Sequence, residues 1–182
     1  VENHKISLPK LLLFSGVIFV LCFVGVIFLF VRNYRDSAIN TLAITFLDIG
    51  QGDATLVQFP EGKTMLVDCA KNAIVLSALS RQLPFWQREI DYLVVTHPDS
   101  DHYGGCIDVL DRYRVKEIIL NGFEKNDSFY HSFVSAVERE SAKIHIVETP
   151  FQWFIGGVTT TFLYPVRSIH DNPQVPGVSG EA

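Results

Sequence analysis

Four side chains of the kinds that bind metal ions fall within six consecutive residues: His97, Asp99, Asp101 and His102. If the backbone is extended here, His97 and Asp99 point the same way and can share one ion, while Asp101 and His102 turn toward a second. Two neighbouring cations can hold a bridging hydroxide and polarise a phosphoryl or carbonyl oxygen. The segment therefore predicts a two-metal hydrolytic centre.

A second interpretation of the same stretch is a solvated turn, in which Asp99 or Asp101 caps the helix that follows. Two histidines beside two carboxylates favour the metal site over this turn. The pair Gly104–Gly105 also favours it, because glycine lets the backbone pass close to a bound group. A helix N-terminus just downstream would attract an anion to the same place.

The elements around this loop predict an α/β fold. Residues 90–96 form a short apolar run typical of a buried strand, and the carboxyl end of such a strand is where open α/β sheets bind ligands. Antiparallel strands come first, and strand–helix units follow. We expect strands at residues 42–47, 54–59, 64–69, 90–96, 115–120, 143–147, 152–155 and 158–164, and helices at 72–82, 107–113 and 129–140.

An uncharged apolar run at residues 11–31 precedes this domain. As a helix it would be roughly 30 Å long, which matches the hydrocarbon core of a bilayer. We expect a single membrane-spanning helix; a secretory signal peptide or a buried hairpin helix is the alternative. Lys5 and Lys10 on one side balance Arg32 and Arg35 on the other, so the flanking charges do not set the orientation.

The charge of the chain argues against a broad basic surface. The formal net charge is −5, and from Asp36 onward 11 basic and 19 acidic residues give −8. Such a domain repels a polyanion at long range, so DNA binding would need a local device such as a metal ion.

The cysteines are few and widely spaced. Cys22, Cys69 and Cys106 are odd in number and form no CxxC pair. We therefore expect neither a disulfide framework nor a zinc knuckle.

The stretch His97-Pro98-Asp99-Ser100-Asp101-His102 resembles the HxHxDH motif of the metallo-β-lactamase superfamily. Residues 46–53 (FLDIGQGD) and 66–68 (LVD) complete the resemblance, in the right order. Together these motifs resemble the metallo-β-lactamase-like domain of the DNA-internalisation competence proteins and their membrane-tethered relatives. The resemblance covers roughly residues 41–165.

The resemblance implies an αβ/βα four-layer sandwich, of which this chain would hold the first half or more. It implies hydrolysis, with two divalent ions (zinc or manganese), of phosphodiester bonds in DNA during competence or DNA uptake. By position, His97 and Asp99 would bind the first ion. Asp101 and His102 would bind the second, and Asp101 could also orient the attacking water.

The resemblance also implies roles near the metal site for Asp68 and for residues of the 48–53 turn. Asp68 would hold a ligand histidine through its carboxylate, or would be an ordinary residue of a strand-end turn. Asp48, Gln51 and Asp53 would line the site, or would belong to a glycine-rich turn.

Departures from the family pattern change some of these expectations. Asp99 replaces a histidine and shifts that position toward oxygen ligation, which suits manganese at least as well as zinc. Cys69 and Ala70 stand where many relatives carry two glycines, and we expect Cys69 to be a small buried residue. His131, His145 and His170 are expected to be structural or exposed rather than ligands.

Residues 1–35 are thus predicted to be a membrane anchor and residues 36–182 a hydrolase domain that is incomplete at its carboxyl end. The start at Val1 and the turn-like ending suggest a piece of a longer polypeptide. The remaining ligands, and the second half of the fold as a partner, would lie beyond it. We expect the domain to be extracytoplasmic. Alternative functions are hydrolysis of another ester or thioester, or a non-catalytic tethered module.

Overall fold

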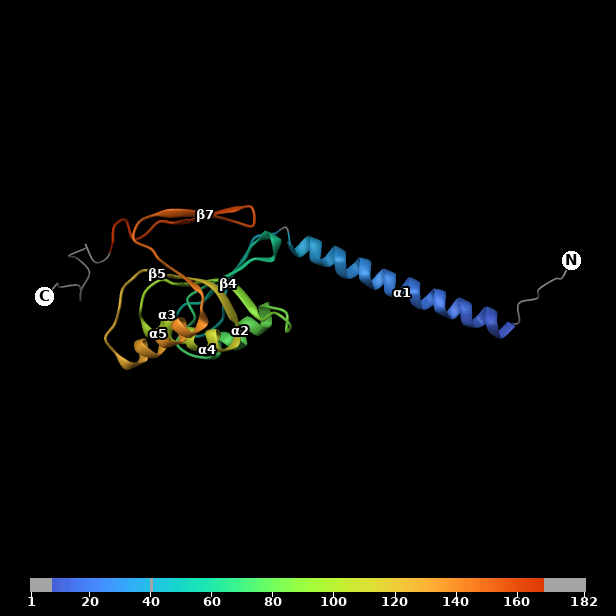
Figure 1. The fold of residues 1–182 in the computed structure, drawn as a ribbon, viewed down its shortest axis with the longest axis horizontal. Coiled ribbons are helices and arrows are strands. Elements are labelled where there is room, and N and C mark those ends of the chain that lie inside the picture. Colours follow the sequence, from blue (N-terminus) through green and yellow to red (C-terminus); the bar gives the residue numbers. More distant parts are fainter. Residues whose placement is uncertain (1–7, 40, 169–182) are drawn as a thin grey trace. The chain divides into compact units, whose positions relative to one another are not determined.

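The computed structural model describes residues 8–39 and 41–168. The chain divides into two units, residues 1–40 and residues 41–182 (Figure 1).

The first unit is the helix α1 (Leu8–Ile39). It confirms helical structure over the predicted range, and its side chains are described for residues 15–30. Among the described residues, no helix combines the length and the apolar character that crossing a membrane requires. The structure therefore does not support the predicted transmembrane helix.

A six-stranded sheet forms the centre of the second unit, with its strands side by side in chain order. Its strands are β1 (Ala43–Phe46), β2 (Thr55–Gln58), β3 (Thr64–Val67), β4 (Glu89–Val95), β5 (Arg114–Leu120) and β6 (Lys143–Ile146). The pairs β1–β2 and β2–β3 are antiparallel, and β3, β4, β5 and β6 are parallel to one another. This change from a hairpin to parallel strands confirms the predicted α/β order.

Helices cover one face of this sheet (Figure 1). They are α2 (Ile74–Gln82), α3 (Ser100–Tyr103), α4 (Cys106–Arg112) and α5 (Ser128–Glu140). Asn72 Oδ1 accepts a hydrogen bond from Ile74 N–H at the start of α2, and Asp127 Oδ1 accepts one from Tyr130 N–H at the start of α5. The main hydrophobic core lies between these helices and the sheet.

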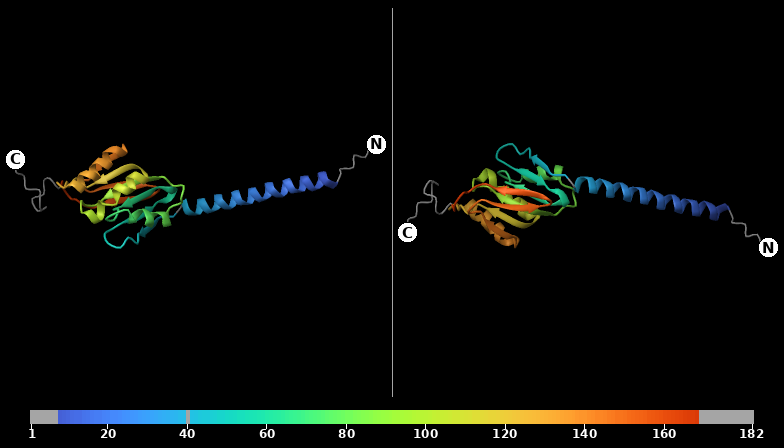
Figure 2. Two further views of the ribbon diagram at one scale, coloured as in Figure 1. Left: turned by 90° about the horizontal axis from the view of Figure 1, so that it is seen from below. Right: turned by 90° about the horizontal axis from the view of Figure 1, so that it is seen from above.

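The opposite face of the sheet carries a two-stranded hairpin, β7 (Phe151–Ile155) and β8 (Val158–Phe162) (Figure 2). Trp153 from the hairpin packs against Tyr92 of β4, with ring centroids 5.5 Å apart. A second hydrophobic cluster joins the hairpin to the sheet. The sheet is thus covered on both faces, as parallel strands require.

This architecture is a mixed α/β fold with a central sheet, as predicted. The short helix α3 was not expected, because its four residues are too few to show a helical period. The complete four-layer sandwich stays a prediction.

A buried carboxylate ties the amino ends of the strands together. Asp91 of β4 is 7% exposed and accepts hydrogen bonds from Thr64 N–H (2.9 Å), Lys63 Nζ (3.1 Å) and Lys116 Nζ (2.8 Å). Burial raises the pKa of Asp91, but the bonds from Lys116, Thr64 and Lys63 outweigh it and hold the pKa below its ordinary value.

Asp91→Asn should lower the free energy of unfolding at pH 7 by about 2 kcal/mol, because hydrogen bonds to charged groups are lost. Since the folded pKa is lowered, this stabilisation is full above the ordinary pKa of 3.8 and is lost as the pH falls from there through the lower pKa of the folded state. Urea unfolding at pH 7 and at successively lower pH values measures both the loss of stability and its pH dependence. Glu89→Gln, which alters a half-exposed partner of Lys116, is the control and should cost under about 1 kcal/mol. A difference that persists at low pH contradicts the account.

Candidate functional site

Strand register brings the ends of three parallel strands together. Val67 of β3 lies opposite Val94 of β4, and Val95 lies opposite Leu120 of β5. The residues that follow these strands, Asp68, Thr96 and Asn121, therefore meet at one edge of the sheet. The predicted metal loop begins at this edge.

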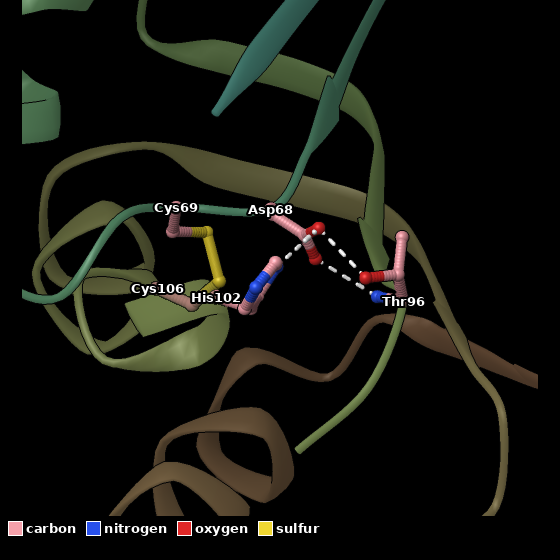
Figure 3. Close-up of a disulfide and its surroundings, with 5 residues drawn as sticks. All are labelled: Asp68, Cys69, Thr96, His102 and Cys106. Atoms are coloured by element: carbon pink, nitrogen blue, oxygen red, sulfur yellow. Dashed lines mark hydrogen bonds and ion pairs between the residues drawn. A yellow bond between two sulfur atoms is a disulfide. The ribbon is translucent and has the colours of Figure 1, made fainter. Parts of the chain in front are cut away.

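Asp68 organises that loop (Figure 3). It is 3% exposed; its Oδ1 accepts from Thr96 N–H (2.9 Å) and its Oδ2 from Thr96 Oγ1 (2.7 Å). The same Oδ2 lies 2.9 Å from His102 Nδ1. Since a carboxylate only accepts, His102 carries a proton on Nδ1, and in the neutral imidazole its Nε2 then keeps a free lone pair.

Thr96 orients the imidazole of His97 in the same way, with Nδ1 as the hydrogen-bond donor. The single hydroxyl proton of Thr96 goes to Asp68, so its oxygen accepts from His97 Nδ1, 3.0 Å away. In the neutral imidazole, His97 Nε2 is then the unprotonated nitrogen, and it lies 3.4 Å from Asp99 Oδ2. The imidazole rings of His97 and His102 are 3.8 Å apart between centroids.

Asp53 joins this group from the turn after β1. Its Oδ2 lies 3.8 Å from His102 Nε2. We call His97, Asp99, His102 and Asp53 the histidine–carboxylate cluster. The structure thus brings three of the predicted site residues together with one that sequence alone left as either lining or turn.

The donor chemistry of this cluster fits a divalent cation. Ligands of a tetrahedral ion with bonds of about 2.1 Å lie about 3.4 Å apart, and the His97 Nε2–Asp99 Oδ2 spacing is 3.4 Å. Within the described part of the chain, however, no group of three histidine, cysteine, aspartate or glutamate side chains is placed to hold one ion. The cluster provides pairs of donors, which is part of a coordination sphere.

Asp101 lies in α3, where its backbone contributes to the loop. Its carbonyl accepts from Asp53 N–H at 3.3 Å. Gly52 passes so close that an added Cβ would lie 2.2 Å from this carbonyl, and its φ of +94° also requires glycine. The roles of the Asp101 carboxylate as ligand and as base stay predictions.

Asp48 and Gln51 are exposed and lie outside the cluster. The Asp48 carbonyl accepts a long hydrogen bond from Arg81, 3.4 Å away. This arrangement fits the turn interpretation for these two residues, and lining of the site by them stays a prediction.

Lys125 is a neighbour of the cluster that the sequence did not reveal. It forms an ion pair with Asp99 Oδ1 from the loop after β5. The hydrogen bond from Lys125 lowers the pKa of Asp99. Its place after a parallel strand was the available signal, because loops at that edge share one site.

The helix-cap interpretation of the loop fails for Asp99. Asp99 occupies the N-cap position of α3, but its side chain makes no capping hydrogen bond. Gly104 and Gly105 also differ from expectation, because they approach protein backbone: a Cβ on Gly105 would lie 2.2 Å from the Cys69 carbonyl. Both glycines are thus required for close packing of the loop, and their closeness to a bound group stays a prediction.

A disulfide between Cys69 and Cys106 corrects the prediction that the cysteines form none. The two residues are 37 positions apart, and only folding brings their Cα atoms within 5.1 Å. Cys69 is buried, as expected, but it is not a simple packing residue. Asp68 (φ 58°) and Ala70 (φ 61°) on either side are left-handed, a conformation that costs a non-glycine residue about 1 kcal/mol.

The other two described histidines, His131 and His145, lie outside the cluster. His145 Nε2 lies 2.6 Å from Glu117 Oε2, and its ring packs edge-on against Trp153. His131 is exposed on α5, within 3.4 Å of Asn126 Oδ1. Both agree with the expected structural or exposed roles, and His170 lies outside the described residues.

Asp68→Asn tests the orientation of His102. An asparagine turned to satisfy Thr96 N–H places its amide donors toward His102, so His102 should shift its proton to Nε2. ¹⁵N NMR of the histidine rings above pH 7 measures this tautomer, and Zn²⁺ or Mn²⁺ affinity should fall by about 10- to 100-fold. Asn121→Asp, at the same edge, is the control. An unchanged His102 tautomer would contradict the assignment.

Comparisons with known proteins agree with this geometry. The model of the metallo-β-lactamase superfamily matches residues 47–167. The chain is 32% identical to Recombination protein 2 of Haemophilus influenzae over 139 residues. This matched region makes up 74% of the chain and 16% of the relative. It is also 32% identical over 73 residues to a metallo-β-lactamase fold-containing protein of Sulfurisphaera tokodaii. This second matched region makes up 38% of the chain and 28% of the relative.

The chain spans less than a third of the length of either relative. The family match nevertheless covers more than half of this chain and includes the cluster and the sheet edge that carries it. The chain therefore belongs to the metallo-β-lactamase superfamily.

Proposed function

We propose that the chain is part of a metal-dependent hydrolase that cleaves phosphodiester bonds in DNA. The supporting observation is that the Nε2 atoms of His97 and His102 lie 3.4 Å and 3.8 Å from carboxylate oxygens of Asp99 and Asp53, at the edge where an α/β sheet binds ligands. Two divalent ions, zinc or manganese, would supply a metal-activated water and polarise the phosphoryl oxygen.

The residues of the chain divide the work of such a site. His97 and Asp99 hold the first ion, and Asp101 and His102 hold the second. Asp101 also orients the attacking water and accepts its proton. Asp68 keeps His102 in the tautomer that can bind metal, and the contact of Asp53 with His102 supports a place at the rim of the site.

DNA is the proposed substrate for two reasons. The name of the Haemophilus relative places that protein in recombination, and the sequence motifs resemble those of DNA-internalisation competence proteins. The acidic surface is compatible with this substrate if the metal ions, rather than a basic face, attract the phosphate. A role in DNA uptake during competence follows from the same resemblance.

His97→Ala/Asp101→Ala should reduce cleavage by at least about 100-fold, because it removes a ligand of one ion and the base of the reaction. The assay incubates the intact protein with labelled single- and double-stranded DNA and added Mn²⁺ or Zn²⁺. The matched control is Asp111→Ala/His131→Ala, which removes the same residue types at exposed positions on α4 and α5.

The result separates the proposed function from its alternatives. If the intact protein cleaves DNA no faster than the His97→Ala/Asp101→Ala variant, the proposed nuclease activity is rejected. Metal-dependent turnover of a thioester or a lactone, without DNA cleavage, would assign another ester substrate. Metal binding without any turnover would assign a non-catalytic module.

The first unit is proposed to associate with a lipid bilayer, with the second unit outside the cytoplasm. Along residues 15–30 of α1, large apolar side chains are exposed, including Phe19 (71%) and Phe30 (72%). An apolar surface of this extent marks an interaction site, and lipid is the partner with matching chemistry. The disulfide supports the location, because such bonds persist in oxidising compartments.

Leu21→Glu/Phe28→Glu should abolish association with lipid, since a charged side chain in an apolar bilayer costs about 2.5–3.5 kcal/mol. Flotation of the protein with phospholipid vesicles on a density gradient measures it. Ser77→Glu/Thr159→Glu, at exposed positions of the second unit, should float like the parent. A parent protein that stays at the bottom of the gradient would reject lipid association.

A further inference from the structure

The disulfide lies directly beside the residues that orient the histidines of the cluster (Figure 3). Cys69 follows Asp68 in the chain, and Cys106 is the first residue of α4, four positions after His102. Both cysteines are 0% exposed. The bond therefore joins the two segments whose side chains form the Asp68–His102 hydrogen bond.

Backbone contacts connect the same two segments. Cys69 N–H donates to the His102 carbonyl at 2.7 Å, and Gly105 N–H donates to the Ala70 carbonyl at 3.0 Å. The first of these bonds involves His102 itself, so a movement of Cys69 moves the backbone that carries the imidazole. Asp68 and Ala70 hold left-handed conformations on both sides of Cys69.

Without the covalent bond, only noncovalent contacts such as the backbone hydrogen bonds would join these two segments. The bond holds the Cα atoms of Cys69 and Cys106 5.1 Å apart, and neither two thiols nor two alanine methyl groups impose that distance. Hydrogen bonds weaken steeply as their geometry degrades, so the 2.9 Å contact between Asp68 Oδ2 and His102 Nδ1 would weaken as the segments gain freedom.

We propose that the Cys69–Cys106 disulfide is a positioning element of the site: it holds Asp68 against His102 and thereby fixes the tautomer and direction of that imidazole. The geometric claim stands without any substrate. Its consequence, that the site is assembled in the oxidised protein and loosened in the dithiol form, rests on the proposed function. Interconversion takes two electrons and two protons, as when a dithiol reductant becomes a disulfide and releases the Cys69 and Cys106 thiols.

The test compares the ring nitrogens of His102 by ¹⁵N NMR in the complete oxidised chain and in Cys69→Ala/Cys106→Ala. The spectra are recorded without metal, at one pH above 7, and His102→Gln identifies the signal. In the oxidised protein the proton should reside on Nδ1. In the double variant the ratio of the Nδ1–H to the Nε2–H form should fall by about tenfold.

A matched variant separates positioning from general stability. Leu110→Ala removes a buried side chain from the same helix and the same core as Cys106 and leaves the disulfide intact. It should lower stability within the range that also covers loss of a disulfide, and leave the His102 tautomer unchanged. An equal change of tautomer in Leu110→Ala would overturn the proposal, as would an unchanged His102 in the double variant.

A second measurement tests the proposal if the double variant does not fold. The oxidised wild-type chain is treated with a phosphine reductant, and alkylation with mass detection reports the two thiols. The Nδ1–H signal of His102 should be lost in step with the appearance of these thiols. Complete reduction with an unaltered His102 signal would overturn the proposal. Because neither readout uses metal or DNA, failure of the nuclease assay leaves this result independent.

Discussion

The site depends on one buried carboxylate. Asp68 lies almost out of contact with solvent at the end of β3, and three donors surround its oxygens: Thr96 N–H, Thr96 Oγ1 and His102 Nδ1. A buried carboxylate is costly unless its oxygens are satisfied. The contacts that satisfy Asp68 are also the ones that direct the imidazoles of His97 and His102.

The sheet makes this arrangement possible. Parallel pairing of β3, β4 and β5 places their carboxyl ends at one edge, whereas the antiparallel β1–β2 hairpin returns Asp53 to the same edge. At the amino end of β4, Asp91 and two lysines tie neighbouring strands together. Helices on one face and the β7–β8 hairpin on the other leave the strand ends as the place where polar side chains gather.

Features that depend on residues close together in the sequence could be predicted. The strands and hairpins follow from local alternation and turn residues, and three members of the cluster, His97, Asp99 and His102, are close together in the sequence. Contacts between distant residues could not be predicted without a resemblance. The ion pair of Lys125 with Asp99 and the bond of Cys69 with Cys106 exist because loops after different strands converge, and nothing local to either residue indicates its partner. The apolar run at residues 11–31 is helical as expected, although the described residues do not show a membrane-spanning helix.

The central claim is that the cluster binds a divalent ion through the histidine nitrogens that Asp68 and Thr96 leave unprotonated. Anomalous diffraction from crystals of the intact protein grown with Zn²⁺ or Mn²⁺ tests this directly. We predict a metal peak within about 2.2 Å of His97 Nε2 or His102 Nε2, with an aspartate oxygen as a further ligand. A fully occupied metal elsewhere, or no anomalous peak at these nitrogens in saturating metal, would contradict the account.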